Sequence, residues 1–376
     1  MRRTALALAL LLALAGCGTD DAPTSDPTSD GGASSAPSTG ATGDGTDAGA
    51  SGATVDGTRE DPTVVEPTEA LLDWQDAGVP AGVGYVKGPA WEALSDEGRT
   101  RVDLQADAMS TSVVAGGGRT VSEVLMSEDW AVVVRQDKAE TAPSQVAAID
   151  LATGEQRDLV SPAAASGGSW ALTGGDLYYP TYGDDRAYCL ATAALADANG
   201  EDGWCAPARS GFSGLTASAD GVAMMTFDDA RPVACRTLDL LDGSGVPQPV
   251  DGPTDCLGWD VAATPDGVVW SEVPKPRRQE EAHLYASVDG AYADLGPGTT
   301  GSVVPCGGSV FFVRDPQSPD EPARLMRWTP DHTLEVAYAS TSTGNAFLGE
   351  PVCGGGVITL SSFGEQGDEH VWANVG

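Results

Sequence analysis

Residues 264–273 read TPDGVVWSEV, in which an Asp-Gly pair is followed by a run of apolar and β-branched residues. An Asp-Gly pair between two such runs is typical of a β-hairpin. Related stretches begin at these positions: SEDWAVVV at Ser127, TGGDLYYP at Thr173, SADGVAMMTF at Ser218, CGGSVFFV at Cys306, CGGGVITL at Cys353 and, more weakly, PAGVGYV at Pro80. One hairpin unit therefore recurs along most of the chain.

The recurring unit has a period near 46 residues. Its turn positions, spaced 41 to 47 residues apart, are Gly82, Glu128, Gly174, Asp220, Asp266, Gly307 and Gly354. A period of this length with several strands per unit predicts an all-β fold, the β-propeller. Seven four-stranded blades would use residues 61–376 as one domain. The first unit, residues 71–105, is the weakest because residues 105–120 read as an irregular loop, so six blades with an N-terminal extension are the alternative.

Each unit from Val121 onward divides into four strands, here called A (innermost) to D (outermost). In the second unit these are residues 121–128, 130–136, 144–151 and 155–160. Matching C strands begin at Arg186, Pro232, Ala282 and Ala323. The chain ends in a C strand, HVWANVG. Because an open sheet edge favours aggregation, we expect residues near Thr63, Val64 and Val65 to supply the missing D strand and close the ring.

The PDG and ADG hairpins followed by apolar strands, over most of residues 121–376, resemble the TolB-type propeller repeat. The resemblance implies the fold and little about function, since that repeat serves binding and scaffolding proteins and a few enzymes. Residues 146–155, VAAIDLATGE, are similar to the repeat of quinoprotein propellers, in which the motif holds blades together. Here Arg157 and Asp158 replace the Trp that usually follows the turn. We therefore expect no cofactor.

Residues 1–16 contain two arginines and then an apolar core of about ten residues, which is too short to span a bilayer and typical of a secretory signal peptide. The segment ends at Leu14-Ala15-Gly16-Cys17, which resembles the lipobox of bacterial lipoproteins, where a diacylglyceryl group is added to the Cys thiol. Residues 17–60 are Gly, Ser, Thr, Asp, Ala and Pro rich, and cannot offset their chain entropy by burial. The resemblance implies a disordered tether on a protein held at the outer face of the cell membrane.

The composition is strongly acidic. The chain has 55 acidic and 20 basic residues and a formal net charge of −35. Such a charge repels a phosphate backbone, so we expect no nucleic-acid partner, and we expect a monomer. The scarce amine and imidazole side chains, which most acid–base chemistry uses, are Lys87, Lys138, Lys275, His283, His332 and His370.

Six cysteines remain once Cys17 is lipidated, and an even number in an exported chain favours three disulfides over a metal site. The sequence has no CxxC pair, so we expect no zinc ribbon or redox dithiol. Two cysteines lie one period apart in equivalent C strands, each followed by another after 16 or 21 residues. Of fifteen pairings we favour Cys189 with Cys205, Cys235 with Cys256, and Cys306 with Cys353.

Charged and aromatic residues gather where B strands end, on the face made by the B–C and D–A loops, where propeller ligands usually bind. The candidate binding residues are Arg135, Tyr182, Asp184, Asp228, Arg277 and Arg314. The plain alternative is that strand ends at water are polar. Arg277 belongs to the dense basic stretch PKPRRQEE, a candidate contact loop or simply a solvated one. Residues 197–203, DANGEDG, have alternate oxygen ligands, but the Gly is misplaced for a calcium loop, so a solvated turn is favoured.

These features favour a tethered propeller lipoprotein that binds an envelope protein, a glycan or a small ligand without catalysis. The alternative is an exported lyase or hydrolase that uses Asp, Arg and Tyr on the same face. The sequence lacks GxSxG and SxxK signatures, which disfavours the serine hydrolases that carry them. A deep pocket with converging carboxylates of perturbed pKa would favour an enzyme, whereas a flat face would suit a binding module.

We expect Cys17 to be the mature, lipid-bearing N-terminus, because a short apolar segment ending in LAGC precedes a tether-like stretch. The Cys17→Ala variant should be released from the membrane or accumulate as the unprocessed precursor. Mass spectrometry of the wild-type protein tests this directly, and an unmodified thiol at Cys17 would overturn the predicted location.

Overall fold

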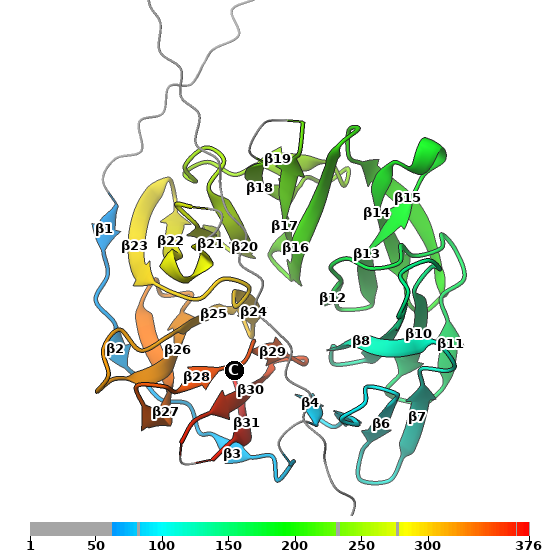
Figure 1. Ribbon diagram of the computed structural model, residues 1–376, viewed down its shortest axis with the longest axis horizontal. Helices are drawn as coiled ribbons and strands as arrows, with labels where there is room; N and C mark the ends of the chain where they lie inside the picture. Colours follow the sequence, from blue (N-terminus) through cyan, green and yellow to red (C-terminus); the bar gives the residue numbers. More distant parts are fainter. Residues whose placement is uncertain (1–61, 81–82, 231–233, 276–277, 366, 376) are drawn as a thin grey trace, which may run out of the picture. The chain divides into compact units, whose positions relative to one another are not determined.

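The computed structural model describes residues 62–80, 83–230, 234–275, 278–365 and 367–375. These residues belong to the unit Gly57–Gly376 and form seven sheets, the blades of a β-propeller (Figure 1). The seven-bladed, all-β prediction is therefore confirmed. None of the helices among the described residues is long and apolar enough to cross a membrane.

The first four blades take their strands in chain order from the propeller axis outward. Blade 1 contains β4 (Gly84–Lys87), β5 (Glu92–Ser95), β6 (Arg101–Gln105) and β7 (Ser110–Val114). Blade 2 contains β8 (Arg119–Met126), β9 (Trp130–Asp137), β10 (Gln145–Asp150) and β11 (Gln156–Asp158). Blade 3 contains β12 (Ala171–Thr173), β13 (Asp176–Tyr182), β14 (Tyr188–Ala194) and β15 (Asn199–Cys205), with the 3-10 turn η1 (Asp184–Arg186) between β13 and β14. Blade 4 contains β16 (Ser210–Ser218), β17 (Gly221–Asp228), β18 (Cys235–Leu241) and β19 (Pro247–Pro249).

The last three blades each receive an additional strand from the N-terminal segment. Blade 5 contains β20 (Gly258–Thr264), β21 (Gly267–Glu272), β22 (His283–Val288), β23 (Ala291–Pro297) and then β1 (Thr63–Val64), with the 3-10 turn η2 (Gln279–Glu281). Blade 6 contains β24 (Val304–Cys306), β25 (Ser309–Arg314), β26 (Pro322–Trp328), β27 (Leu334–Thr343) and then β2 (Thr68–Glu69). Blade 7 has a divided inner strand, β28 (Phe347–Leu348) and β29 (Val352–Cys353), followed by β30 (Val357–Phe363), β31 (Glu369–Asn374) and β3 (Gln75–Asp76).

The predicted turn chemistry is seen in the hairpins. Asp289 and Gly290 join β22 to β23 with φ angles of 49° and 81°, the left-handed pair that a type I′ turn requires. In the Asp-Gly unit of blade 5, a Cβ at Gly267 would lie 2.1 Å from the carbonyl oxygen of Ser287, so only glycine fits there. The repeat therefore depends on glycine at points of close backbone approach.

The hydrophobic core lies between successive blades, since five of its buried clusters each join two neighbouring blades from blade 2 to blade 7. A sixth joins blades 1 and 2. Between blades 7 and 1, by contrast, the described contacts are mainly close approaches of the backbone. The Lys87 amide donates to Thr359 Oγ1 at 3.1 Å, and a Cβ at Gly354 would lie 2.2 Å from the Lys87 carbonyl oxygen. Glycine at position 354 thus lets the last blade approach the first.

The N-terminal segment closes the ring, but with different residues from those predicted. β3 pairs antiparallel with β31 as the outer strand of blade 7, whereas Thr63 and Val64 pair parallel with β23 of blade 5. The segment runs along the outside of blades 5, 6 and 7 (Figure 1). The sequence-based prediction placed the closing strand at Thr63–Val65 because these residues are β-branched. The position is set instead by Trp74, whose indole N–H donates to the Ala337 carbonyl at 2.7 Å and whose ring packs edge-on against Tyr338.

Blade 1 also departs from the predicted alignment. The predicted turn position Gly82 lies outside the described residues, and the stretch read as turn and B strand there contains the innermost strand, β4. The turn that follows β4 is closed by the Gly88 amide, which donates to the Trp91 carbonyl at 2.8 Å. Residues 105–120, read as an irregular loop, contain β7. The strands of blade 1 have only four or five residues, so the unit is shorter than the others. Counting back by a period of 46 residues therefore placed the innermost strand of blade 1 where a B strand was expected.

All three predicted disulfides are present. Cys189–Cys205 joins β14 to β15 within blade 3, and Cys235–Cys256 joins β18 to the segment before β20. Cys306–Cys353 joins the inner strands of blades 6 and 7. Each closure lowers the entropy of the unfolded chain, which is worth about 2 to 4 kcal/mol in typical proteins.

Removal of residues 18–60 should leave the melting temperature nearly unchanged, whereas removal of residues 18–79 should lower it sharply and cause aggregation through the exposed edge of β31. The point variant Trp74→Ala should cost about 2 to 3 kcal/mol, less than a fully buried Trp, because its ring is half-buried. The matched control is Leu71→Ala, since Leu71 is 54% exposed and should change stability by no more than about 0.5 kcal/mol. Equal melting temperatures for both truncations would contradict closure by β3.

Candidate functional site

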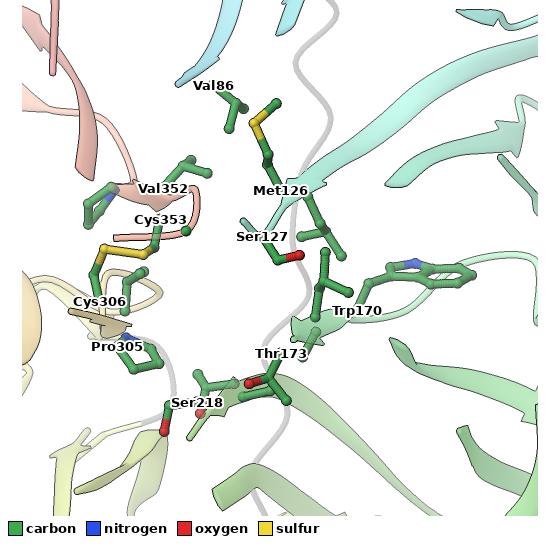
Figure 2. A pocket seen from close by; sticks show the side chains of 18 of the residues that line it. Val86, Met126, Ser127, Trp170, Thr173, Ser218, Pro305, Cys306, Val352 and Cys353 are labelled. Carbon is green, nitrogen blue, oxygen red and sulfur yellow. A yellow bond between two sulfur atoms is a disulfide. The ribbon is translucent and has the colours of Figure 1, made fainter. Parts of the chain in front are cut away.

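The innermost strands of the blades surround a central channel with a volume of about 1000 Å³. Residues of β4, β8, β12, β16, β20, β24 and β29 line it, together with the turns between A and B strands. Inner strands are short and converge toward the axis, so their side chains meet across the opening. In Figure 2 the labelled side chains gather around one open space, and they come from six of the seven blades.

The channel wall combines apolar surface with hydroxyl and charged groups. Val86, Met126, Trp170, Pro305 and Val352 contribute apolar surface (Figure 2). Among the hydroxyls, Ser127, Thr173 and Ser218 line the same space. The Ser127 hydroxyl donates to the Gly174 carbonyl of the next blade at 2.8 Å, so this group is fixed in place. A wall of this kind suits a ligand with an apolar body.

One disulfide forms part of the channel wall. Cys306 and Cys353 end the inner strands β24 and β29, and their bridge is seen beside the opening in Figure 2. In the turns that follow, Gly307 directly after Cys306 has a φ angle of 56°, and Gly355, two residues after Cys353, has a φ angle of 60°. The bridge ties blade 6 to blade 7, so this part of the wall cannot separate while it is intact.

Glu123 and Glu350 are two of three channel carboxylates with raised pKa values. The third is Asp220, where burial and then the charge of Asp266 raise the pKa. Glu123 lies at an irregularity in β8, and burial, followed by the nearby charge of Glu350, raises its pKa to about 8. The pKa of Glu350, which precedes β29, is raised by burial and then by the charge of Asp260. Both side chains line the channel. Glu123 is therefore mostly protonated near neutral pH, and it can donate a hydrogen bond or release a proton to accept a cation.

Asp260 stands behind the channel wall and has a structural role. Burial raises the pKa of this carboxyl to about 6, against the opposing effect of hydrogen bonds from Ser271 and Gly301. The Ser271 hydroxyl donates to it at 2.7 Å, and the Gly301 amide lies 3.0 and 3.1 Å from its two oxygens. Asp260 thus holds the loop between blades 5 and 6 against β20.

The residues predicted to bind on the loop face are dispersed. Arg135, Tyr182, Asp228 and Arg314 lie at B-strand ends of blades 2, 3, 4 and 6, and Asp184 lies in η1. None of these five is among the described residues that line the channel. Arg277 lies outside the described residues. The structure therefore brings no two of these six candidates together in the channel.

Several of these candidates have partners within the protein. Arg314 is buried, and its guanidinium donates to the carbonyls of Pro297, at 2.9 Å, and Leu295 in the neighbouring blade. Arg135 forms an ion pair with Asp158 at 2.9 Å. Tyr182 is exposed and packs edge-on against Tyr188. The arginines thus join blades or strands, and strand-end polarity accounts for the charge pattern.

One serine and histidine pair lies beside the channel. Ser361 lines the channel, and its hydroxyl is 2.9 Å from His370 Nδ1 on the adjacent strand. Burial lowers the pKa of His370, so the ring is neutral near pH 7. Its Nε2 is buried and has no hydrogen-bond partner among the residues that the structure describes. A catalytic histidine is normally oriented by a third group on its second nitrogen, and this pair lacks one.

The residues considered as metal ligands form no open site. The calcium-like stretch contains β15, so Glu201 and Asp202 belong to an outer strand rather than a ligand loop. Among the described residues, Cys235, Asp255 and Cys256 come close enough together to hold a metal ion. Both sulfurs of this group are joined in a disulfide.

Comparisons with known proteins show the fold. No protein-family model and no curated protein sequence matches the chain. Among solved structures, the β-propeller domain of the Trilobed protease from Pyrococcus furiosus is similar, with a TM-score of 0.54, 11% identity, and coverage of 77% of this chain and 95% of that one. A structure from a study of two prolyl endopeptidases has a TM-score of 0.51 and 14% identity. The match covers 75% of this chain and 44% of that one. The acylaminoacyl peptidase of Pyrococcus horikoshii is also similar, with a TM-score of 0.51 and 10% identity. The match covers 74% of this chain and 48% of that one. The chain spans less than half of these two peptidases.

We expect the stability of the wild-type protein to fall as pH rises from about 4.5 to about 8, because the folded state keeps a proton on Glu123 that the unfolded chain has lost. The Glu123→Gln variant should remove this cost. At pH 8.5 it should be more stable than the wild type by at least about 1.4 kcal/mol, the equivalent of one pKa unit, and at pH 4.5 it should be close to it.

Denaturant unfolding at both pH values measures the effect. The control is Glu128→Gln, since Glu128 also lines the channel but is exposed at a turn. A Glu123→Gln variant no more stable than the wild type at pH 8.5 would show that this carboxyl is solvated rather than buried.

Proposed function

We propose that the protein is a lipid-anchored propeller on the outer side of the cell membrane and that its central channel binds a ligand without catalysis. The ligand would carry a cationic group on an apolar body. One observation supports this most strongly, namely the pair of carboxylates Glu123 and Glu350 within a partly apolar channel of about 1000 Å³. The single arginine among the described lining residues is Arg99, so the lining is acidic overall.

The carboxylates explain why a cation is favoured over a neutral or anionic ligand. Both lose part of their hydration in the channel, which is why their pKa values are raised. An ammonium or guanidinium group would supply the missing opposite charge and favour the ionised form of Glu123. Binding should therefore release a proton near neutral pH and strengthen as pH rises toward 8.

The predicted lipid anchor and the three disulfides are the features that favour this location. The signal-like residues 1–16 and the candidate lipidation site Cys17 lie outside the described residues. Disulfides persist mainly in oxidising compartments, and three of them lie within the described part of the propeller. Under this proposal the tether holds the propeller near the envelope molecules that it binds.

Catalysis is the second candidate function, and the same carboxylates favour it. A carboxyl that is protonated near neutral pH can serve as a general acid, as the alternative of an exported hydrolase or lyase would need. The described lining contains no lysine or histidine, both channel cysteines are bridged, and His370 lacks an orienting partner. Turnover of peptide or glycan oligomers that is lost in Glu123→Gln and kept in Glu128→Gln would establish this alternative.

The charge preference can be tested with three ligands that share one body: hexylammonium, hexanol and hexanoate. Saturation-transfer NMR should detect binding of hexylammonium, weaker binding of hexanol and none of hexanoate, because the last would meet the channel carboxylates. The hexylammonium signal should grow between pH 6 and pH 8.5, and Glu123→Gln should remove most of that growth.

Steric closure of the channel supplies the control. The Thr173→Trp variant should abolish binding, since Thr173 points into the opening (Figure 2). Gln248→Trp on the exposed outer strand β19 should bind as the wild type does. Binding of hexanoate equal to that of hexylammonium, or binding insensitive to Thr173→Trp, would contradict the proposal.

A further inference from the structure

The outermost strands of the blades differ in how their free edges are protected. In blades 5 and 6, the edges of β23 and β27 are covered by β1 and β2, both in parallel orientation. The Val65 amide donates to the Asp294 carbonyl at 3.0 Å, and the Ala70 amide donates to the Val336 carbonyl at 3.2 Å. In blade 7 the outermost strand is the two-residue β3. The molecule thus already adds short extended segments to blade edges.

The outer strands of blades 2, 3 and 4 carry features that discourage further pairing. β11 has three residues, two of them charged, and Asp158 is engaged by Arg135. β15 carries Glu201 and Asp202, and the Gly200 amide donates to the Ser161 carbonyl at 2.7 Å, so its start is already bridged. β19 is Pro-Gln-Pro. Charge, proline, short length and covering segments are the usual means by which proteins protect sheet edges.

The outer strand of blade 1 has none of these features. β7 has the sequence STSVV, with five residues, no charge, no proline and no glycine. No strand among the described residues pairs with its outer side. Val114 is 59% exposed at its end. Val and Thr favour extended backbone, so β7 presents a regular, accessible edge.

The hydrogen bonds next to β7 show which of its backbone groups point outward. The Ala115 amide donates to the Thr100 carbonyl at 2.8 Å, and the Ala106 amide donates to the Met109 carbonyl at 2.9 Å. Bonded and non-bonded pairs alternate in an antiparallel ladder. With the register Val102 opposite Val113, the residues at 111 and 113 bond β6. The N–H and C=O groups of residues 110, 112 and 114 therefore face away from the blade.

We propose that the outer edge of β7 binds an extended segment of a partner protein as a fifth strand of blade 1. Backbone hydrogen bonds from residues 110, 112 and 114 would supply the affinity. Small or β-branched side chains in the partner would fit beside Ser112 and Val114, as Thr63 and Val64 do at the edge of β23. This surface lies on the outside of the propeller and is independent of the channel.

Charge selects a partner protein over a second copy of this chain. Each copy carries a formal net charge of −35, so pairing of two β7 edges would bring two strongly acidic bodies together. A segment with lysine or arginine on both sides of its uncharged strand would instead be attracted. The occupant is therefore an extended, Thr- or Val-rich segment with basic flanks.

A synthetic peptide, KKTVTVTKK, is a suitable probe, and its control is the same peptide with alternate backbone amides N-methylated. Fluorescence anisotropy should show binding of the first peptide and none of the second, because methylation removes the donors that pair with β7. Hydrogen exchange should slow at the amides of Ser110, Ser112 and Val114 when the peptide binds. Equal binding of the two peptides would overturn the proposal.

Two variants locate the site without removing backbone hydrogen bonds to β6, although Ser112→Pro also removes the side-chain hydrogen bonds of Ser112 with Arg101 and Asp103. Ser112→Pro deletes an outward N–H, and Val114→Lys places a charge on the edge; each should weaken peptide binding by about tenfold or more. The matched control is Val160→Lys, since Val160 is 74% exposed but lies outside the named strands, and it should bind as the wild type does. Unchanged affinity in both β7 variants would overturn the proposal.

Two further outcomes would replace the proposed occupant. A wild-type dimer in light scattering that Val114→Lys converts to a monomer would show that a second copy occupies the edge. Tighter peptide binding after deletion of residues 18–60 would show that this segment of the same chain competes for it. A monomer whose peptide affinity is unaffected by that deletion is the result the proposal predicts.

Discussion

The pairing of β3 with β31 is the interaction on which the rest of the structure depends. Six blades complete themselves in chain order, but the seventh ends at its third strand and needs an outer strand from the other end of the chain. Trp74 anchors that strand by a hydrogen bond to Ala337 and by packing against Tyr338. Blade 7 then meets blade 1 at the close backbone contact of Gly354 with Lys87. A ring closed in this way cannot open at one terminus without breaking a pair of strands.

Closure of the ring creates the channel and sets its electrostatics. Glu123 belongs to blade 2 and Glu350 to blade 7, so the two carboxylates come near each other only when the last blade is seated beside the first. Their raised pKa values represent a cost to folding above neutral pH, and residues retained at such a cost are often functional. The Cys306–Cys353 bridge fixes the adjoining wall. The channel combines rigidity, apolar surface and acidity, which together favour a cationic ligand.

The sequence predicts most of the fold because each blade repeats the same local chemistry. The Asp289-Gly290 turn, the C strands and the cysteines one period apart all follow from residues close in the chain. Blade 1 and the strand at Gln75–Asp76 were misassigned because their positions depend on packing between distant segments, which no local pattern records. For Glu123 the sequence contains a weak signal of a functional position, since this charged residue interrupts the otherwise apolar inner strand VSEVLM. For Glu350 the sequence contains no such signal, since its pKa depends on burial in the folded channel and on Asp260, ninety positions earlier in the chain.

Native-state hydrogen exchange at Ala77 tests the central claim, closure of the ring by β3, most directly. The Ala77 amide donates to the His370 carbonyl at 2.8 Å, next to the β3–β31 pair. If the ring depends on this pair, Ala77 should exchange only through global unfolding, whereas the Val65 amide beside the peripheral strand β1 should exchange through local fraying. Exchange at Ala77 as fast as that at Val65, with the core strands still protected, would contradict the account.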